Sequence, residues 1–289
     1  MAGPTAPGRT FASDLIALAG VVSRALGDPR IVELAVPPAD ARGHDGEFCA
    51  VRLDCGDVGL AFVLLGDARD RLEPRRFSAS DAPPAITLAR ALAGGSASQR
   101  AQALACVNAL SQALMRAAAF APAAAGDSFG GLAPEPGDRL GMVGFFPPLV
   151  RQALARGIDV TVVEMRSELS RDEPGLRVTT DRTALAPCNK VLCTSSVLLN
   201  DTLEAILEAC APDASIAIVG PSAGCLPDPL FARGVSFVAG TAIERPDVFT
   251  QRVSLGAPWG DAARKYAIGS RQWPGAERLL ERIARAQRG

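Results

Sequence analysis

Beyond residue 137 the sequence alternates short apolar runs with helical segments, and this alternation constrains the fold more than any other feature. We expect strands at residues 139–145, 159–163, 191–194, 215–219 and 235–239. We expect helices at residues 147–156, 201–210 and 274–285, and a short segment at 228–233. Apolar strands separated by helices are typical of a parallel sheet covered on both faces. The sequence therefore predicts an α/β protein in which residues 137–289 form a Rossmann-like, doubly wound, mainly parallel sheet.

The first part of the chain has a different pattern. Residues 11–26 carry apolar side chains at helical spacing, and three β-rich runs follow at 31–36, 48–53 and 60–65. Such runs, separated by turn residues, are typical of an antiparallel meander. Helices are expected at 87–93 and 96–120. We predict a disordered leader over 1–10 and a small α+β domain over 11–125, with the domain boundary in the Ala-, Pro- and Gly-rich loop 121–137.

Charge and hydropathy exclude several classes of partner. The 289 residues carry a formal net charge of −1, whereas a nucleic-acid binder needs a basic surface. No apolar run reaches the roughly 18–20 residues of a membrane span, and the first residues lack the apolar segment of a signal peptide. We therefore expect a cytoplasmic protein with a small-molecule substrate and no membrane partner. Its size and class suggest a homodimer.

Scarce residue types narrow the chemistry. His44 is the single histidine, so a site with several His ligands cannot exist. The lysines available for Schiff-base chemistry are Lys190 and Lys265, and we expect no pyridoxal phosphate. The 7 cysteines never form CxxC, and we interpret them as buried thiols. A soft-metal site at Cys188, Cys193 and Cys225 is the weaker alternative, so no metal ligand is predicted.

Several runs fall at the ends of expected strands and look like a known signature. They are GDRLGMVGFFPPLV at 137–150, LLNDTLE at 198–204, GPS at 220–222 and AGT at 239–241. They are similar to the DUF364 family, which is labelled for heavy-metal chelation. Residues 98–110, with VNAL at 107–110, resemble the DUF4213 domain that precedes it. The resemblance implies an enolase-N-terminal-like first domain and a Rossmann-like second domain. Asn189-Lys190 departs from the family, which usually has an acidic residue before that strand.

The motif loops define a candidate site. In doubly wound sheets, ligands bind at the carboxyl ends of the strands near a topological switch point. Since the motifs follow expected strands, we expect them to meet at one edge and form a crevice. The candidate ligand-binding residues are Gly144, Phe145, Phe146, Glu164, Thr194, Ser195, Gly220, Pro221, Gly240 and Thr241.

The first loop discriminates between ligands. A dinucleotide site needs GxGxxG, so that backbone N–H groups approach the pyrophosphate. Here the segment is GMVGFFPP, in which Pro147 and Pro148 remove two donors. NAD is therefore not expected, nor is FAD or ATP bound in the usual way. Glu164 follows the second strand, where an acid accepts hydrogen bonds from ribose hydroxyls. This combination favours S-adenosylmethionine (SAM), with Phe145 or Phe146 against the adenine or the sulfonium.

Two residues are candidates for catalysis. Asp201 and Glu204 have the spacing of a helix capping box, which accounts for them without function. Asn200 lies outside that box and is predicted to project into the crevice, and Ser222 could donate to an amino-acid moiety. Two interpretations remain open. The first is an enzyme that transfers a group from SAM or cleaves or cyclises its aminobutyrate arm, acting on an amino-acid-like compound. The second is a non-catalytic protein that binds a heavy metal or a metal chelate, with thiolates or with Glu164, Asp201 and Glu204.

Overall fold

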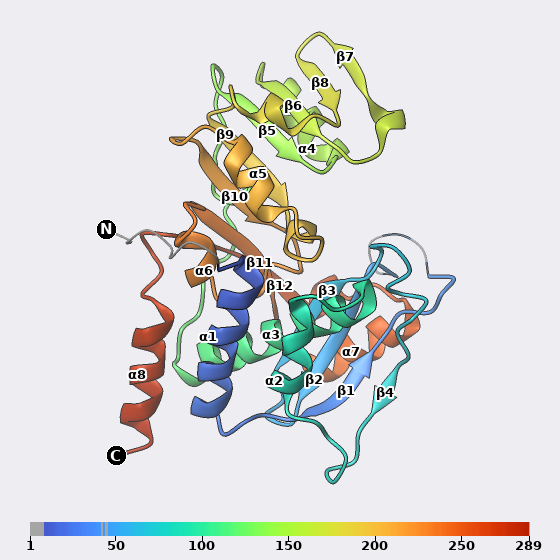
Figure 1. Cartoon of the computed structure of the whole chain (residues 1–289), viewed down its shortest axis with the longest axis vertical. Helices are drawn as coiled ribbons and strands as arrows, with labels where there is room; N and C mark the ends of the chain where they lie inside the picture. The colour runs from blue at the N-terminus through green and yellow to red at the C-terminus, as the bar shows by residue number, and fades with distance from the viewer. Residues whose placement is uncertain (1–8, 42, 44–45, 289) are drawn as a thin grey trace.

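The computed structural model describes residues 9–41, 43 and 46–288, and it contains two sheets (Figure 1). Residues 1–8, within the expected leader, and His44 lie outside this described part. An antiparallel sheet of 4 strands belongs to the first part of the chain, and a mainly parallel sheet of 8 strands belongs to the rest. The predicted fold class is therefore confirmed. Among the described residues no helix has the length and apolar character needed to cross a membrane.

The small sheet has the strand order β3-β2-β1-β4, in which β1, β2 and β3 form the predicted meander and β4 is an additional strand that was not predicted. Its strands are β1 (Ile31–Ala35), β2 (Phe48–Leu53), β3 (Val58–Phe62) and β4 (Arg75–Arg76). The helices of this part are α1 (Phe11–Ala25), α2 (Ala85–Ala89) and α3 (Ala97–Ala117). Helix α3 lies directly on β3, because a Cβ on Gly59 would come within 2.2 Å of the α3 backbone. Glycine is the residue type that allows this close approach.

The large sheet has the strand order β12-β11-β10-β9-β5-β6-β8-β7. Its strands are β5 (Arg139–Val143), β6 (Asp159–Val163), β7 (Arg171–Glu173), β8 (Leu176–Thr179), β9 (Lys190–Thr194), β10 (Ser215–Val219), β11 (Phe237–Ile243) and β12 (Ala263–Gly269). From β5 the chain proceeds to β6 and β8 on one side, and it then returns to β9 on the other side. The topological switch point therefore lies between β5 and β9, whose carboxyl ends carry Gly144 and Ser195.

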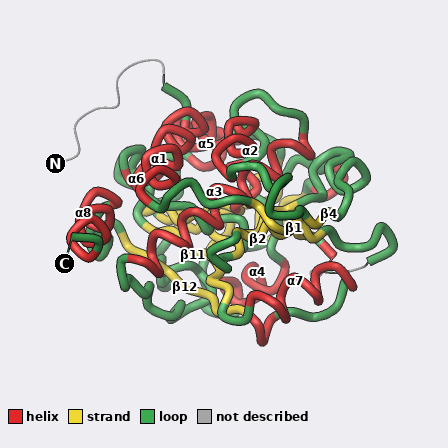
Figure 2. The backbone as a smooth tube through the Cα atoms, turned by 90° about the horizontal axis from the view of Figure 1, so that it is seen from below, coloured by secondary structure: helices red, strands yellow, loops and turns green. Residues whose placement is uncertain are grey.

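Five helices accompany the large sheet in sequence. They are α4 (Pro147–Leu154), α5 (Leu203–Ala209), α6 (Asp228–Phe231), α7 (Pro246–Leu255) and α8 (Ala276–Ala286). Seen from below, α1, α2 and α5 lie on one side of the strands, and α4 and α7 lie on the other (Figure 2). Helix α7 leaves the large sheet and packs against β1 and β2 of the small one. Phe249 and Val253 form a cluster there with Phe48 and Trp259.

Part of the large sheet differs from the sequence-based expectation. Strand β12 is antiparallel to β11, and β7 forms an antiparallel hairpin with β8. Neither β12 nor α7 was predicted, because polar residues interrupt the sequences ARKYAIG and PDVFTQRVSL. Trp259 and Tyr266 near the C-terminus are both buried, so these two aromatic side chains pack inside the molecule. The division into two domains at residues 125–137 remains a prediction.

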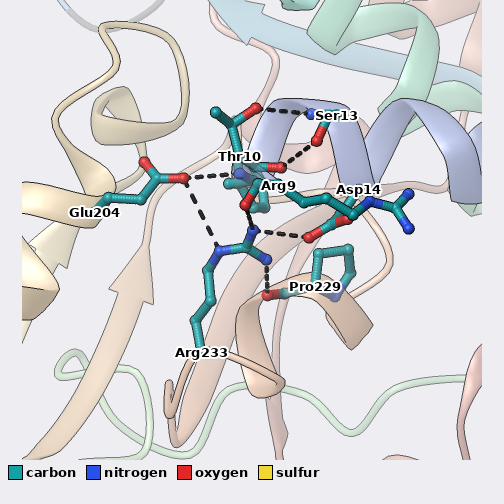
Figure 3. A network of polar contacts seen from close by, with 8 residues as sticks. Arg9, Thr10, Ser13, Asp14, Glu204, Pro229 and Arg233 are labelled. Atoms are coloured by element: carbon teal, nitrogen blue, oxygen red, sulfur yellow. Dashed lines mark hydrogen bonds and ion pairs between the residues drawn. The ribbon is translucent and has the colours of Figure 1, made fainter. Parts of the chain in front are cut away.

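Polar contacts join the two parts of the chain in the interior. Asn108 on α3 donates through Nδ2 to the carbonyl oxygens of Leu60 (2.8 Å) and Ser222 (2.9 Å). The Phe62 amide donates to Ser222 Oγ over 2.8 Å. A further network lies at the start of α1 (Figure 3). There Arg233 binds Asp14 (2.7 Å), and the Phe11 amide donates to Glu204 Oε1 (2.7 Å).

Candidate functional site

A cavity of about 780 Å³ lies at the switch point of the large sheet. Ligand sites of small molecules typically occupy about 300–1,000 Å³. The predicted residues that line the cavity are Gly144, Phe145, Phe146, Glu164, Thr194, Ser195, Asn200, Gly220 and Pro221. The sheet topology brings them together, since they follow β5, β6, β9 and β10 and the carboxyl ends of parallel strands share one edge.

The turn after β5 needs glycine at residue 144. Gly144 has φ +89°, and a Cβ there would lie 3.1 Å from Cγ2 of Thr194. Its amide donates to the Val163 carbonyl over 2.9 Å, which holds the turn against the end of β6. The next residue, Phe145, donates its amide to Glu164 Oε2 over 3.1 Å. The chain after β5 is therefore fixed next to the carboxylate that follows β6.

Glu164 is the acid at the centre of this cavity wall. Its side chain is 12% exposed, and Arg166 lies 3.4 Å away, between Nε and Oε1. Burial acts to raise the pKa of Glu164, but hydrogen bonds from the Arg166 side chain and from the Arg166 and Phe145 amides outweigh it. The pKa is therefore lowered, and the group is a carboxylate at neutral pH. The two bonds from the Arg166 side chain are long, at 3.4 and 3.5 Å. A ligand hydroxyl that donates to Glu164 would therefore replace the Arg166 guanidinium, because about four acceptor positions of a carboxylate are already used.

The aromatic side chains after Gly144 belong to the cavity wall, and prolines follow them. The guanidinium of Arg171 lies over the Phe145 ring, 5.1 Å from its centre. Helix α4 begins with Pro147 and Pro148, which have no N–H. The first positions of this helix therefore offer no donors to an anion, in contrast to a helix that cradles phosphate.

Hydroxyl groups lie at the carboxyl end of β9. Thr194 Oγ1 accepts from the Ser196 hydroxyl (3.2 Å) and caps a 3₁₀ turn over Ser195–Leu198. Gly220 at the end of β10 approaches this turn so closely that a Cβ would lie 2.3 Å from Ser195 Oγ. The loop after β9 and the loop after β10 are therefore in contact at the cavity.

The predicted capping box at Asp201 and Glu204 is wrong. Helix α5 has Thr202 as its N-cap without a side-chain cap bond. Asp201 instead accepts from both Nη atoms of Arg100 on α3, and Glu204 accepts from the Phe11 amide. The physical reason is the backbone of Asp201, whose φ of 57° is left-handed and delays the start of the helix. Asn200, expected to be free of capping, accepts from the Thr202 amide and hydroxyl.

Three predicted residues lie outside the cavity lining. Ser222 is fully buried, and its hydroxyl accepts from the Phe62 amide. We therefore assign Ser222 a structural role in place of the predicted catalytic one. A Cβ on Gly240 would lie 2.8 Å from the Tyr266 hydroxyl oxygen, which indicates close packing of β11 on β12. Thr241 is buried on the same strand.

The first part of the chain supplies a wall that the sequence analysis missed. Its lining residues are Glu47, Phe48, Phe62, Leu64 and Leu65. They lie at the start of β2, at the end of β3 and in the segment that follows β3. No pattern within those strands indicates contact with the large sheet, which is distant in sequence. Met165 and Arg166 were also missed, although their place directly after Glu164 was an available signal. Leu64 and Met165 are among the exposed large apolar residues of the described chain.

The metal alternative depends on which His, Cys, Asp and Glu side chains the structure brings together. Within residues 9–41, 43 and 46–288 there is no group of three or more His, Cys, Asp or Glu side chains that could hold a metal ion. Burial raises the pKa of Cys225 to about 12 and raises that of Cys193 well above its ordinary value. Both groups are therefore thiols at neutral pH in the metal-free protein, and each would have to lose its proton to bind a metal.

The chain is similar to families and structures of the same architecture. A family model of DUF364, described as "Putative heavy-metal chelation", matches residues 129–270. A DUF4213 model with the same description matches residues 46–111. A crystal structure of a DUF364 protein of unknown function from Pyrococcus horikoshii has a TM-score of 0.68 at 21% identity, over 90% of this chain and 100% of that one. One from Desulfitobacterium hafniense DCB-2 has a TM-score of 0.63 at 19% identity, over 88% and 99%. No curated protein matches the chain.

Proposed function

We infer from the two family models that the chain belongs to the DUF364 family, with a DUF4213 region ahead of it. We propose that its cavity binds SAM as the substrate of a group-transfer or cleavage reaction. The observation that carries the proposal is the joint position of the Gly144 turn and the Glu164 carboxylate in one cavity at the switch point. In sheets of this topology that is where a nucleoside is held.

The residues present fit a nucleoside that has no phosphates. Glu164 is ionised, and it would accept from the ribose hydroxyls in place of the Arg166 side chain, whose bonds to it are 3.4 and 3.5 Å long. Phe145 and Phe146 offer aromatic surface for the adenine or for the positive sulfonium. The proline-initiated helix α4 has no N–H donors for a pyrophosphate at its first positions. This set of groups supports SAM over NAD, FAD or ATP.

The rest of the cavity would orient the ligand and exclude water. Bound SAM supplies an electrophilic carbon beside a sulfonium, which leaves as a neutral thioether when a nucleophile attacks. The first part of the chain contributes Phe62, Leu64 and Leu65 to the cavity lining. These apolar side chains would exclude water from that carbon. The hydroxyls of Thr194 and Ser196 and the amide of Asn200 are polar groups for an amino-acid moiety. We therefore propose an amino-acid-like compound as the substrate class.

The reaction is tested by product analysis. The purified protein is incubated with SAM, with and without a mixture of amino acids, and the products are separated by mass. Methyl transfer releases S-adenosylhomocysteine, whereas cleavage or cyclisation of the aminobutyrate arm releases 5′-methylthioadenosine. Either product, reduced in Glu164→Ala, supports the proposal. Unchanged SAM in every mixture would contradict the proposed reaction.

A second candidate function follows from the description shared by both family models, which names heavy-metal chelation. The described side chains include no group of three or more that could hold a bare metal ion, and the thiols of Cys193 and Cys225 would have to lose their protons to bind one. A metal already enclosed in an organic chelate would fit the apolar cavity better. This alternative predicts that the cavity binds a preformed metal complex and that Cys225→Ser leaves the metal content unchanged.

A further inference from the structure

The amide group of Asn200 has a defined orientation. The Thr202 amide donates to Asn200 Oδ1 over 3.3 Å, and the Thr202 hydroxyl donates to the same oxygen over 2.6 Å. A backbone N–H is a donor only, so the atom that receives it must be the carbonyl oxygen of the side chain. Because Oδ1 is engaged in this way, Nδ2 is the polar atom that Asn200 offers to a ligand in the cavity that it lines.

The position of Asn200 in the sheet determines which part of a ligand it can meet. In the strand order β9-β5-β6, Asn200 follows β9 and Glu164 follows β6, so the two residues lie on opposite flanks of the Gly144 turn. A nucleoside whose ribose is bound by Glu164 would direct its amino-acid arm towards Asn200. The ammonium group of such an arm can only donate, whereas its carboxylate accepts. Nδ2 therefore matches the carboxylate.

A contact from the first part of the chain holds this turn. Asp201 has φ +57°, a left-handed conformation that is uncommon for residues other than glycine. Its carboxylate is bound by both Nη atoms of Arg100, whose side chain is only 11% exposed. Bidentate pairs of this kind fix geometry as well as charge. The residue next to Asn200 is therefore held by helix α3, which is distant in sequence.

On the basis of the proposed function, we propose that Asn200 Nδ2 binds the carboxylate of the ligand's amino-acid arm and that the Arg100–Asp201 pair positions it. Asn200 is then the residue that selects a ligand with a carboxylate over one without. Arg100 touches no ligand, and it acts through the conformation of Asp201.

The experiment compares two ligands by calorimetry: SAM, and decarboxylated SAM, which keeps the sulfonium and the amine but lacks the carboxylate. Asn200→Asp keeps the acceptor for Thr202 and replaces the Nδ2 donor by a second oxygen. We expect this variant to bind SAM about tenfold or more weakly, because a charged hydrogen bond is lost and repulsion is added. Decarboxylated SAM should be bound at least as tightly as by the wild type.

The positioning role is tested with matched arginines on the same helix. Arg100→Ala should lower the preference for SAM over decarboxylated SAM, as Asn200→Asp does. Arg116 also forms a bidentate pair, with Asp57 (2.6 Å and 2.9 Å), but it lies at the other end of α3 and outside the cavity lining. Arg116→Ala should leave the preference unchanged, even if it destabilises the fold. Asp201→Gly, which tolerates the positive φ, should retain more of the preference than Asp201→Ala.

The outcomes separate this inference from the proposed function. Equal weakening of both ligands in Asn200→Asp, or no change in either, would overturn the carboxylate assignment while SAM binding itself stands. An unchanged preference in Arg100→Ala would overturn the positioning role alone. If the wild type binds neither compound, the proposed function fails and the assignment fails with it.

Discussion

The backbone amide of Phe145 donates a hydrogen bond to Glu164 Oε2 over 3.1 Å. This bond connects the turn after β5 with the acid after β6, on one side of the topological switch point. The carboxylate is thereby oriented before any ligand arrives, and preorganised groups lose less entropy when a ligand binds.

Removal of the carboxylate should weaken SAM binding. Each charge-assisted hydrogen bond that a ribose hydroxyl donates to Glu164 is worth about 1.5–3 kcal/mol. Glu164→Ala should therefore raise the dissociation constant by about tenfold or more. Glu164→Gln keeps the size of the side chain and loses the charge, and it should fall between the wild type and Glu164→Ala. Calorimetry of the three proteins measures this. Equal affinities in all three would remove Glu164 from the site.

The pKa of Glu164 also predicts a pH dependence of stability. Since the folded protein lowers this pKa below its ordinary value of 4.5, ionised Glu164 stabilises the fold above that pH. The contribution should disappear as the pH falls through the lowered pKa. The wild type should therefore be more stable than Glu164→Gln at neutral pH, and the difference should shrink below pH 4.5. Urea unfolding across this range measures it, and a difference that grows on acidification would contradict the assignment.

Substitution of Gly144 should destabilise the protein more than substitution of another glycine with a positive φ. In Gly144→Ala the left-handed backbone should lower the free energy of unfolding by about 1–2 kcal/mol. The added Cβ would also make a close contact with Thr194. Gly157 has φ +72° with nothing within 4 Å of an added Cβ. Gly157→Ala should therefore lose only the free energy that the left-handed backbone costs. The free energy of unfolding should therefore fall further in Gly144→Ala, and only that variant should lose SAM affinity. Equal losses would mean that the turn has space for a side chain.

Asn108 should stabilise the packing of the two parts of the chain against each other. Asn108→Ala leaves the carbonyls of Leu60 and Ser222 without this donor in the interior, at about 1–3 kcal/mol each. Urea unfolding should show this loss. Asn189, which is exposed and bonded to Asp138, provides the control, and Asn189→Ala should cost well below that amount. A similar effect of both substitutions would show that the buried amide has no special role.

The thiols should differ sharply in reactivity. Cys55 is exposed and the other 6 cysteines are buried. Burial raises the pKa of Cys49 to about 12 and that of Cys210 to about 11. A thiol reagent should therefore modify Cys55 first in the native protein, and all 7 residues only after unfolding. Rapid modification of Cys193 or Cys225 in the folded state would support an accessible thiolate site instead.

The sequence predicted the elements that have a strong local pattern. Strand β6 was expected at residues 159–163, where the structure has it, because its three valines suit a strand and are buried there. A helix was also expected at residues 96–120, and α3 covers Ala97–Ala117, with Ser96 and Gln99 forming a capping box at its start. Strand β12 was missed because Arg264 and Lys265 hide its pattern, and an edge strand needs no continuous apolar run.

The parts of the site that the sequence could not predict depend on distant contacts. The Arg100–Asp201 pair joins residues 101 positions apart, and it replaces the local capping bond that the spacing of Asp201 and Glu204 predicted. The apolar wall with Phe62 and Leu64 faces the cavity only because the two sheets meet there. Neither feature leaves a periodic signal in its own segment.

The most direct test of the central claim is calorimetric titration of the metal-stripped protein with SAM, with zinc, nickel and cobalt titrated into a second sample. We expect saturable binding of one SAM per chain and no stoichiometric uptake of the metals. No heat with SAM, together with stoichiometric metal uptake that Cys225→Ser diminishes, would contradict the account and establish a thiolate chelator.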